Sequence, residues 1–346
     1  MTIEQLSVSV SLRAMMPDYD DRGRTTMSTM SMMDPELAAA CAAMATEMFK
    51  NGVPAVPERG DVLGLRALLE TGMASVAAPY SSGVSVRSYF VSTVDESEID
   101  VRFYTDGSRT TTDRPAVVYL HGGGMISGKL DHYDGIARYY AQETGVPILL
   151  VDYRLAPEST ATALAEDGFA ALRWLVDRAG ELGVDATRIA VMGDSGGGGV
   201  AAGTAILARE RGIPLAKQIL IYPMLDDRNI EPDPLLEDAV AWTHDNNWTC
   251  WRAVLGEDFG SDRVSPISAP ARLEDFTNLP AAYIEVGELD IFRDESVAYA
   301  TGLYKAGVTC ELHVLPGVIH GHDRLSLDIG VSRRTLDDRC RVIAAL

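Results

Sequence analysis

The sequence of 346 residues predicts an α/β fold in which a mostly parallel sheet is covered by helices on both faces. From about residue 115, short apolar runs that read as strands alternate with helical stretches. Short, continuously apolar strands between helices are typical of a parallel sheet that is buried on both sides. Residues with catalytic chemistry follow several of these runs, as expected where active sites lie beyond the carboxyl ends of the strands.

Two helices are predicted before the sheet begins. The first covers residues 35–49, because Asp34 can cap it and Pro35 suits its first position. The second covers residues 61–75. Nine of the 13 methionines lie within residues 1–55, where they are either ordinary core residues or the lining of an adaptable apolar pocket.

The strands follow in order. Two alternating runs, 84–91 and 99–104, flank an acidic turn and predict an antiparallel hairpin. The later strands are predicted over residues 116–120, 147–151, 189–192, 218–222, 281–286 and 311–315, with helices between them that include residues 164–178, 198–211 and 294–306.

The composition narrows the classes of partner. A net charge of −20 and an isoelectric point near 4.6 argue against nucleic acid or an anionic membrane surface, and we interpret the acidity mainly as a means of solubility. The four cysteines are scattered without a C-x-x-C pair, so neither a zinc site nor a disulfide framework is expected. No signal peptide or membrane-spanning run is recognisable, and a cytoplasmic protein is the simplest inference.

One serine stands in a strand–turn–helix context. The pentapeptide Gly193-Asp-Ser-Gly-Gly197 follows an apolar run and precedes a stretch rich in alanine and glycine. A G-x-S-x-G in this context predicts a sharp, strained turn that exposes the serine hydroxyl. Glycine is expected at 193 and 197 because a Cβ at either position would clash across the bend.

Three further motifs follow strands. His121-Gly-Gly-Gly124 can direct successive backbone N–H groups into one cavity, where they bind a developing oxyanion. Gly287-Glu-Leu-Asp290 supplies a carboxylate, and His320-Gly321 supplies an imidazole. The order serine, acid, histidine is the one found in α/β-hydrolases.

These motifs, with Asp152-Tyr-Arg-Leu-Ala-Pro-Glu158, resemble the hormone-sensitive-lipase-like branch of the α/β-hydrolases, the bacterial family IV esterases. The likeness covers roughly residues 85–335. It implies an eight-stranded sheet with a helical cap. By this resemblance the nucleophile is Ser195, the triad acid is Asp290 and the base is His320. The oxyanion donors are the backbone N–H groups of Gly123, Gly124 and Gly196.

The resemblance also implies a division of the chain into a cap and a catalytic domain. We assign residues 1–55 to the N-terminal part of the cap and residues 56–346 to the catalytic domain, with a second cap segment within about 226–279. Two departures from the family affect the site. Gly196 stands where the family usually has alanine, and Met125 stands where it usually has an aromatic residue, so Met125 is expected to line a flexible substrate pocket.

Other residues compete for the same roles. His322 lies two residues after His320, and Glu288 and Asp294 lie close to Asp290. Only His320 and Asp290 match the family motifs, so these two are preferred. Asp194 is expected to make local hydrogen bonds.

We read two charged residues nearby, Asp152 and Arg154, as a structural ion pair.

The expected activity is therefore hydrolysis of short to medium acyl esters by a carboxylesterase-type serine hydrolase. An alkyl hydroxyl needs a base to become a nucleophile, and histidine can accept its proton and return it to the leaving group. No cofactor or metal is expected. The expected partner is a small-molecule ester substrate, and the sequence does not decide whether the chain forms a homodimer. Lactone or amide hydrolysis by the same triad is the alternative, and a non-catalytic small-molecule receptor is a more distant one.

Overall fold

The structure, a computed structural model, describes residues 18–19, 25–26, 32–51, 57–75, 83–107, 113–233, 236 and 242–346. The strands of the main sheet are β3 (Val84–Ser92), β4 (Glu98–Asp106), β5 (Arg114–Leu120), β6 (Ile148–Val151), β7 (Val184–Asp194), β8 (Lys217–Ile221), β9 (Ala282–Gly287) and β10 (Cys310–Leu315). A separate two-stranded sheet pairs β1 (Asp18–Tyr19) with β2 (Thr25–Thr26).

The eight strands of the main sheet lie in the order β10-β9-β8-β7-β5-β6-β4-β3. β4 runs antiparallel to both of its neighbours, and all other neighbouring pairs are parallel. The β3–β4 pair is the predicted antiparallel hairpin, with Ser92 opposite Glu98 next to its turn. The predicted mostly parallel, eight-stranded sheet is confirmed.

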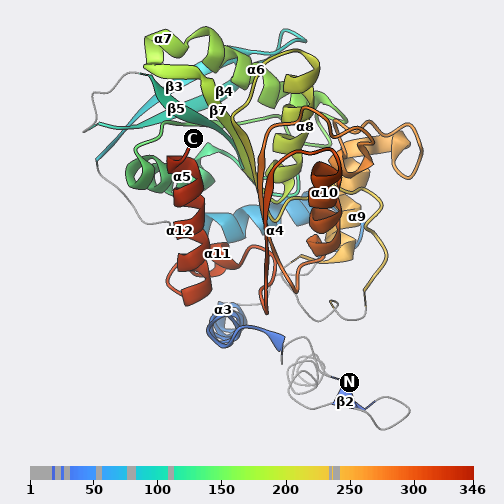
Figure 1. Cartoon of the computed structure of the whole chain (residues 1–346). Helices are drawn as coiled ribbons and strands as arrows, with labels where there is room; N and C mark the ends of the chain where they lie inside the picture. Colours follow the sequence, from blue (N-terminus) through green and yellow to red (C-terminus); the bar gives the residue numbers. More distant parts are fainter. Residues whose placement is uncertain are drawn as a thin grey trace.

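The helices are α3 (Pro35–Asn51), α4 (Val62–Ser75), α5 (Leu130–Thr144), α6 (Ala163–Asp177), α7 (Ala179–Leu182), α8 (Gly196–Glu210), α9 (His244–Leu255), α10 (Arg293–Lys305), α11 (His322–Leu325) and α12 (Gly330–Ala344), with short 3₁₀ turns η1 (Gly256–Asp258) and η2 (Pro270–Arg272). Figure 1 shows α5 and α12 on one side of the sheet and α8 and α10 on the other. Helices on both faces shield the sheet from water, and every residue of β6 and β9 is buried. This double burial explains why β6 is continuously apolar and why β9 is apolar apart from Glu285, rather than alternating.

The N-terminal helix α3 is capped as predicted. The Asp34 carboxylate accepts hydrogen bonds from the N–H groups of Glu36 and Leu37 at 3.0 and 3.2 Å. Met33 is buried, whereas Met32 and Met44 are 42% and 45% exposed. The side chains of the other N-terminal methionines lie outside the described residues, so their expected role in a pocket stays a prediction.

Helix α4 lies beside the segment that we assigned to the cap. The Gly60 N–H, just before α4, donates to Thr249 Oγ1 of α9 at 2.9 Å, and the Arg59 guanidinium lies 4.6 Å above the Trp248 ring. On its other side, Arg66 donates to the carbonyl of Ile126 at 2.6 Å. These contacts tie α4 to α9 and to the loop after β5, while the division of the chain at residue 55 stays a prediction.

No helix in the described ranges is long and apolar enough to cross a membrane.

Candidate active site

Ser195 lies on a sharp turn between β7 and α8. Its backbone angles are φ 55° and ψ −124°, a conformation that residues with a side chain rarely adopt. A Cβ at Gly193 would come within 2.1 Å of the Gly197 carbonyl oxygen, and one at Gly197 within 2.2 Å of the Leu120 carbonyl oxygen. The predicted need for glycine on both sides of the serine is therefore confirmed.

The structure brings Ser195, His320 and Asp290 into one hydrogen-bonded chain. Ser195 Oγ lies 2.9 Å from His320 Nε2, and His320 Nδ1 lies 2.7 Å from Asp290 Oδ2. Asp290 Oδ1 accepts a further hydrogen bond from the Phe292 N–H at 2.9 Å. The three side chains come from the carboxyl ends of β7, β9 and β10, which meet at one edge of the sheet.

This chain of hydrogen bonds is largely shielded from water. Asp290 is 1% exposed, Ser195 7% and His320 9%. The rings of Tyr222 and Phe292 meet the imidazole edge-on, with centroids at 4.8 and 5.1 Å. These contacts fix the orientation of the imidazole between its two partners.

The competing residues have other partners. His322 Nε2 lies 3.1 Å from Thr335 Oγ1, and burial lowers the pKa of this imidazole. Glu288 accepts a hydrogen bond from the Gly317 N–H at 2.9 Å. The Asp294 side chain is exposed and pairs with Arg293. None of the three is bonded to Ser195 or His320.

The glycine loop after β5 lies against the serine turn. Gly123 and Gly124 have positive φ angles of 124° and 60°, and no described residue accepts a hydrogen bond from either N–H group. A Cβ at Gly196 would lie 2.9 Å from the Gly124 nitrogen and 2.6 Å from the Met125 nitrogen. Glycine at 196, where the family usually has alanine, thus lets the loop approach the serine turn closely, while the role of the three N–H groups as oxyanion donors stays a prediction.

Two residues hold this loop from behind. The His121 ring stacks on Tyr153 at 4.4 Å, and a Cβ at Gly128 would come within 2.4 Å of His121 Nδ1. The Tyr133 hydroxyl accepts from the Gly122 N–H at 2.9 Å and donates to Asp194 at 2.7 Å. Burial raises the pKa of the Asp194 carboxyl, which points away from the triad into these local hydrogen bonds, as predicted.

Met125 follows the glycine loop with an unusual φ of 63°. Its side chain is 2% exposed, and a Cβ at Gly199 would lie 2.7 Å from its terminal methyl carbon. The thioether therefore packs against the first turns of α8. Its expected role in lining a substrate pocket stays a prediction.

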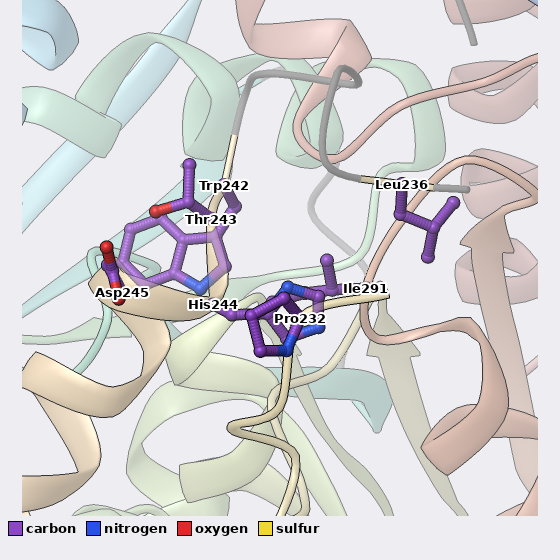
Figure 2. Close-up of a pocket in the computed structure, with 7 residues that line it drawn as sticks. All are labelled: Pro232, Leu236, Trp242, Thr243, His244, Asp245 and Ile291. Carbon is purple, nitrogen blue, oxygen red and sulfur yellow. The ribbon is translucent and has the colours of Figure 1, made fainter. Parts of the chain in front are cut away.

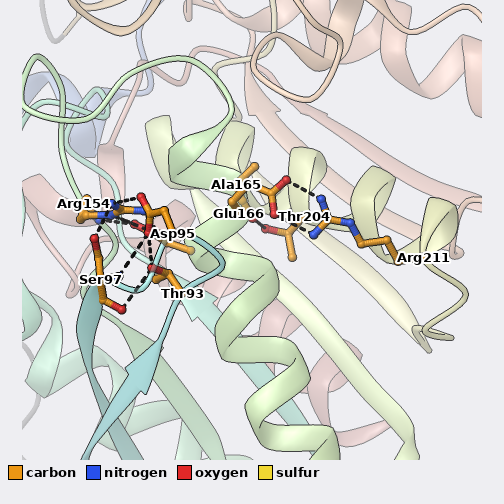
Figure 3. Close-up of polar contacts among 9 residues, drawn as sticks. Thr93, Asp95, Ser97, Arg154, Ala165, Glu166, Thr204 and Arg211 are labelled. Carbon is orange, nitrogen blue, oxygen red and sulfur yellow. Dashed lines mark hydrogen bonds and ion pairs between the residues drawn. The ribbon is translucent and has the colours of Figure 1, made fainter.

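The predicted ion pair between Asp152 and Arg154 is wrong. Arg154 instead binds Asp95 of the β3–β4 turn at 2.7 Å (Figure 3). It also binds Asp167 of α6 at 2.7 Å. Asp152 has a different neighbour, with Oδ1 3.7 Å from His121 Nε2. The Nε and Nη2 groups of Arg154 both donate to the Asp167 carboxylate, and this two-pronged contact engages the guanidinium in place of Asp152.

Sequence reasoning did not single out Arg339, which is 1% exposed in α12. Its Nε donates to Glu285 Oε1 at 3.0 Å, and its Nη1 donates to Asp323 Oδ2 at 2.5 Å. Glu285 belongs to the strand that leads to Asp290, and Asp323 follows His320 by three residues. One buried guanidinium therefore joins the two segments that carry the acid and the histidine.

Tyr222 connects this ion cluster to the triad. Its hydroxyl donates to Asp323 at 2.8 Å, while its ring contacts His320. Burial alone would raise the pKa of Asp323, but the charge of Arg339 and the hydrogen bonds from Arg339 and Tyr222 outweigh burial and lower it. Asp323 is thus held as a carboxylate directly behind the histidine.

Two residues from the segment 226–279 contact the glycine loop. A Cβ at Gly124 would lie 2.6 Å from Cys250 Sγ and 2.7 Å from Trp242 Cη2. The Trp242 ring also faces the imidazole, with centroids 5.9 Å apart. The sequence assigned this segment to the cap without singling out either residue.

Comparisons with known proteins bear on the fold and on the class of enzyme. Residues 117–323 match a family model described as the alpha/beta hydrolase fold. The chain is 40% identical over 217 residues to carboxylesterase NlhH of Mycobacterium tuberculosis, covering 62% of this chain and 68% of that protein. It is 33% identical over 316 residues to ethyl acetate hydrolase of Pseudomonas putida, covering 85% and 92%. Among solved structures, a bacterial heroin esterase has a TM-score of 0.79 at 34% identity and covers 92% of this chain and 99% of its own.

The chain therefore belongs to the α/β-hydrolase family, in its hormone-sensitive-lipase-like branch. This finding confirms the resemblance drawn from the motifs. It also confirms the predicted enzyme class, a carboxylesterase-type hydrolase.

Proposed function

We propose that the chain hydrolyses short to medium acyl esters through an acyl-enzyme on Ser195. The observation that carries this proposal is the hydrogen-bonded chain from Ser195 to His320 and Asp290, at 2.9 and 2.7 Å. A nucleophile within reach of a base, with the base oriented by a third group, is the arrangement that covalent catalysis requires.

In the first half of the reaction, His320 Nε2 accepts the hydroxyl proton as Ser195 Oγ attacks the ester carbonyl. Asp290 holds the proton on Nδ1 and stabilises the imidazolium that forms. The N–H groups of Gly123, Gly124 and Gly196 donate to the carbonyl oxygen as it becomes negative, and one such donor is typically worth about 10²–10³ in rate. His320 then returns the proton to the departing alcohol.

In the second half, water takes the place of the alcohol. His320 removes a proton from this water, the resulting hydroxide attacks the acyl carbon, and the same N–H groups bind the second oxyanion. Collapse of this intermediate returns the proton to Ser195 and releases the carboxylic acid.

The preference for small esters rests on two supports. One is the likeness to a protein named for ethyl acetate, across 85% of this chain. The other is the close approach of Trp242 and Cys250 to Gly124, which limits the space beside the glycine loop.

A fluorophosphonate probe tests the proposal directly. It should label the wild-type protein on the peptide that contains Ser195. Ser195→Ala should not be labelled, and its turnover of a p-nitrophenyl ester should fall by a factor of about 10⁶. His320→Ala should be nearly inactive, whereas His322→Ala, the matched control two residues away, should keep substantial activity. An unlabelled wild-type chain, or an active Ser195→Ala protein, would refute the proposal and favour the receptor alternative or a different nucleophile.

The same assay separates the alternative chemistries. A p-nitrophenyl ester, a lactone and an anilide should be hydrolysed in that order of kcat/KM if the ester assignment is correct. A lactone or anilide that exceeds the ester would show that the triad serves another acyl transfer. A cytoplasmic location and a homodimer stay predictions.

A further inference from the structure

A small cavity lies beside the candidate triad. It has a volume of about 110 Å³, and its lining includes Pro232, Leu236, Trp242, His244 and Ile291 (Figure 2). Ile291 directly follows the triad acid in the chain. This volume is enough for a short organic group.

Trp242 joins this cavity to the catalytic groups. Its ring centroid lies 5.9 Å from that of His320, and a Cβ at Gly124 would meet its Cη2 at 2.7 Å. The indole therefore contacts both the histidine and the glycine loop. A group that occupies the cavity would lie against the same ring as an ester bound at Ser195.

The polar atom of this ring has no partner. Trp242 is 5% exposed, and its Nε1 is buried without a hydrogen bond to any described residue. In an indole, Nε1 lies on the same long edge as Cζ2 and Cη2, the two ring atoms that come nearest to a Cβ at Gly124. A buried donor that stays unpaired costs free energy, and an indole N–H can only donate. The atom that would satisfy it is a hydrogen-bond acceptor.

We propose that the cavity is a substrate subsite in which Trp242 Nε1 donates to an acceptor oxygen on one of the two groups of the ester. This inference rests on the proposed serine esterase activity and narrows its substrates. The favoured class is a short ester that carries an ether or carbonyl oxygen a few bonds from the scissile bond. The apolar side chains of Pro232, Leu236 and Ile291 surround the remaining carbon atoms of that group.

Paired substrates test the donor on each side of the ester. On the acyl side, p-nitrophenyl 3-methoxypropanoate is compared with p-nitrophenyl pentanoate, and on the alcohol side 2-methoxyethyl acetate with butyl acetate. Each pair differs by one oxygen in place of a methylene. In one of the two pairs, Trp242→Phe should lower kcat/KM for the ether ester by roughly tenfold, the value of one ordinary hydrogen bond, while the alkyl ester changes little.

Trp248→Phe is the matched control. It is the same substitution on a tryptophan of α9 that meets Phe259 edge-on and lies beneath the Arg59 guanidinium, and it should leave both ratios unchanged. An equal change of both esters in Trp242→Phe, or no change in either pair, would overturn the proposal and leave the indole a packing role only.

Two further measurements keep the result interpretable. Where Trp242→Phe does not fold, the wild-type preference is compared with the ratio of hydroxide-catalysed rates for the same pair. The subsite is supported if the enzyme prefers the ether ester by more than the hydroxide-catalysed ratio. It is overturned if the enzymatic and hydroxide-catalysed ratios are equal. Ser195→Ala is assayed in parallel: hydrolysis that survives in this variant refutes the proposed esterase itself, whereas unchanged ratios in an enzyme that depends on Ser195 refute only the subsite.

Discussion

The serine side and the histidine side of the candidate site are held in place by different kinds of interaction. On the serine side, the glycine loop is fixed by close backbone contacts and by the Tyr133 hydroxyl between Gly122 and Asp194. On the histidine side, the segment after His320 is fixed by the buried guanidinium of Arg339.

The two sides should therefore respond differently to substitution. A single neutral hydrogen bond contributes about 1 kcal/mol, so the serine side should weaken in small steps unless a backbone contact is disturbed. A buried ion pair that loses one partner leaves an uncompensated charge, which costs about 3–5 kcal/mol. A single substitution of Arg339 should therefore destabilise the histidine side strongly.

The largest effect is expected for Arg339→Met. The substitution leaves Glu285 and Asp323 buried without their cation, and it should lower the free energy of unfolding by about 3–5 kcal/mol. Urea unfolding followed by circular dichroism measures the change. Arg341→Met on the same helix is the control, because Arg341 is about half exposed and its ion pairs should contribute less than about 1 kcal/mol. Similar losses in both variants would show that the buried cluster has no special role.

Gly196→Ala should produce the next largest effect, this time on the serine side. The added Cβ meets the Met125 and Gly124 nitrogens, so the glycine loop must move and at least one oxyanion donor is displaced. We expect kcat for a p-nitrophenyl ester to fall by about 10². Gly180→Ala serves as control, because its Cβ would enter open space. Unchanged kcat in Gly196→Ala would mean that the loop tolerates alanine as the family usually does.

A smaller effect is expected for Tyr133→Phe. Loss of the hydroxyl removes the acceptor of the Gly122 N–H and one donor to Asp194, at a cost of about 1–3 kcal/mol. If the lost hydrogen bonds let the glycine loop move, the activation free energy should rise by about 1.4 kcal/mol, and kcat should then fall by about tenfold. Steady-state kinetics on Tyr133→Phe and on the half-buried Tyr139→Phe compare the two hydroxyls. A change in thermal stability without any change in kcat would show that this tie does not position the loop.

The smallest effect concerns pH. Burial lowers the pKa of His322, so the folded chain binds a proton at this site less readily than the unfolded chain, in which histidine titrates near pH 6.5. The stability that depends on neutral His322 is complete above about pH 6.5 and is lost as pH falls through the lower pKa of the folded state.

In His322→Gln, the difference in melting temperature between pH 7.5 and pH 5.5 should therefore shrink, by about 1–3 °C. Thermal unfolding at the two pH values gives the result, with the partly exposed His313→Gln as control. An undiminished difference in His322→Gln would assign the acid sensitivity to other groups.

The same contrast explains what the sequence could reveal. Ser195, Asp290 and His320 each follow a strand in a short local motif, and the glycines near Ser195 are required by a turn that the motif itself defines. Such features need only neighbouring residues to be recognised.

Arg339 could not be found in this way, because its partners Asp323 and Glu285 lie 16 and 54 residues away. Nothing in the sequence of α12 marks one arginine among several as buried. Trp242 is a similar case, since its contact with Gly124 depends on how a long, irregular segment folds back over the site. The error at Arg154 has the same origin, because nearness in sequence says little about which of several carboxylates a long cationic side chain will meet.

The backbone of Ser195 has a consequence on the evolutionary time scale. Its angles of φ 55° and ψ −124° cost about 1–3 kcal/mol for any residue with a Cβ, whether or not a substrate is bound. Natural selection for turnover is what maintains a side chain there. In a lineage relieved of that selection, glycine at position 195 would be favoured by stability alone, so a descendant with Ser195→Gly would record the loss of the ancestral chemistry.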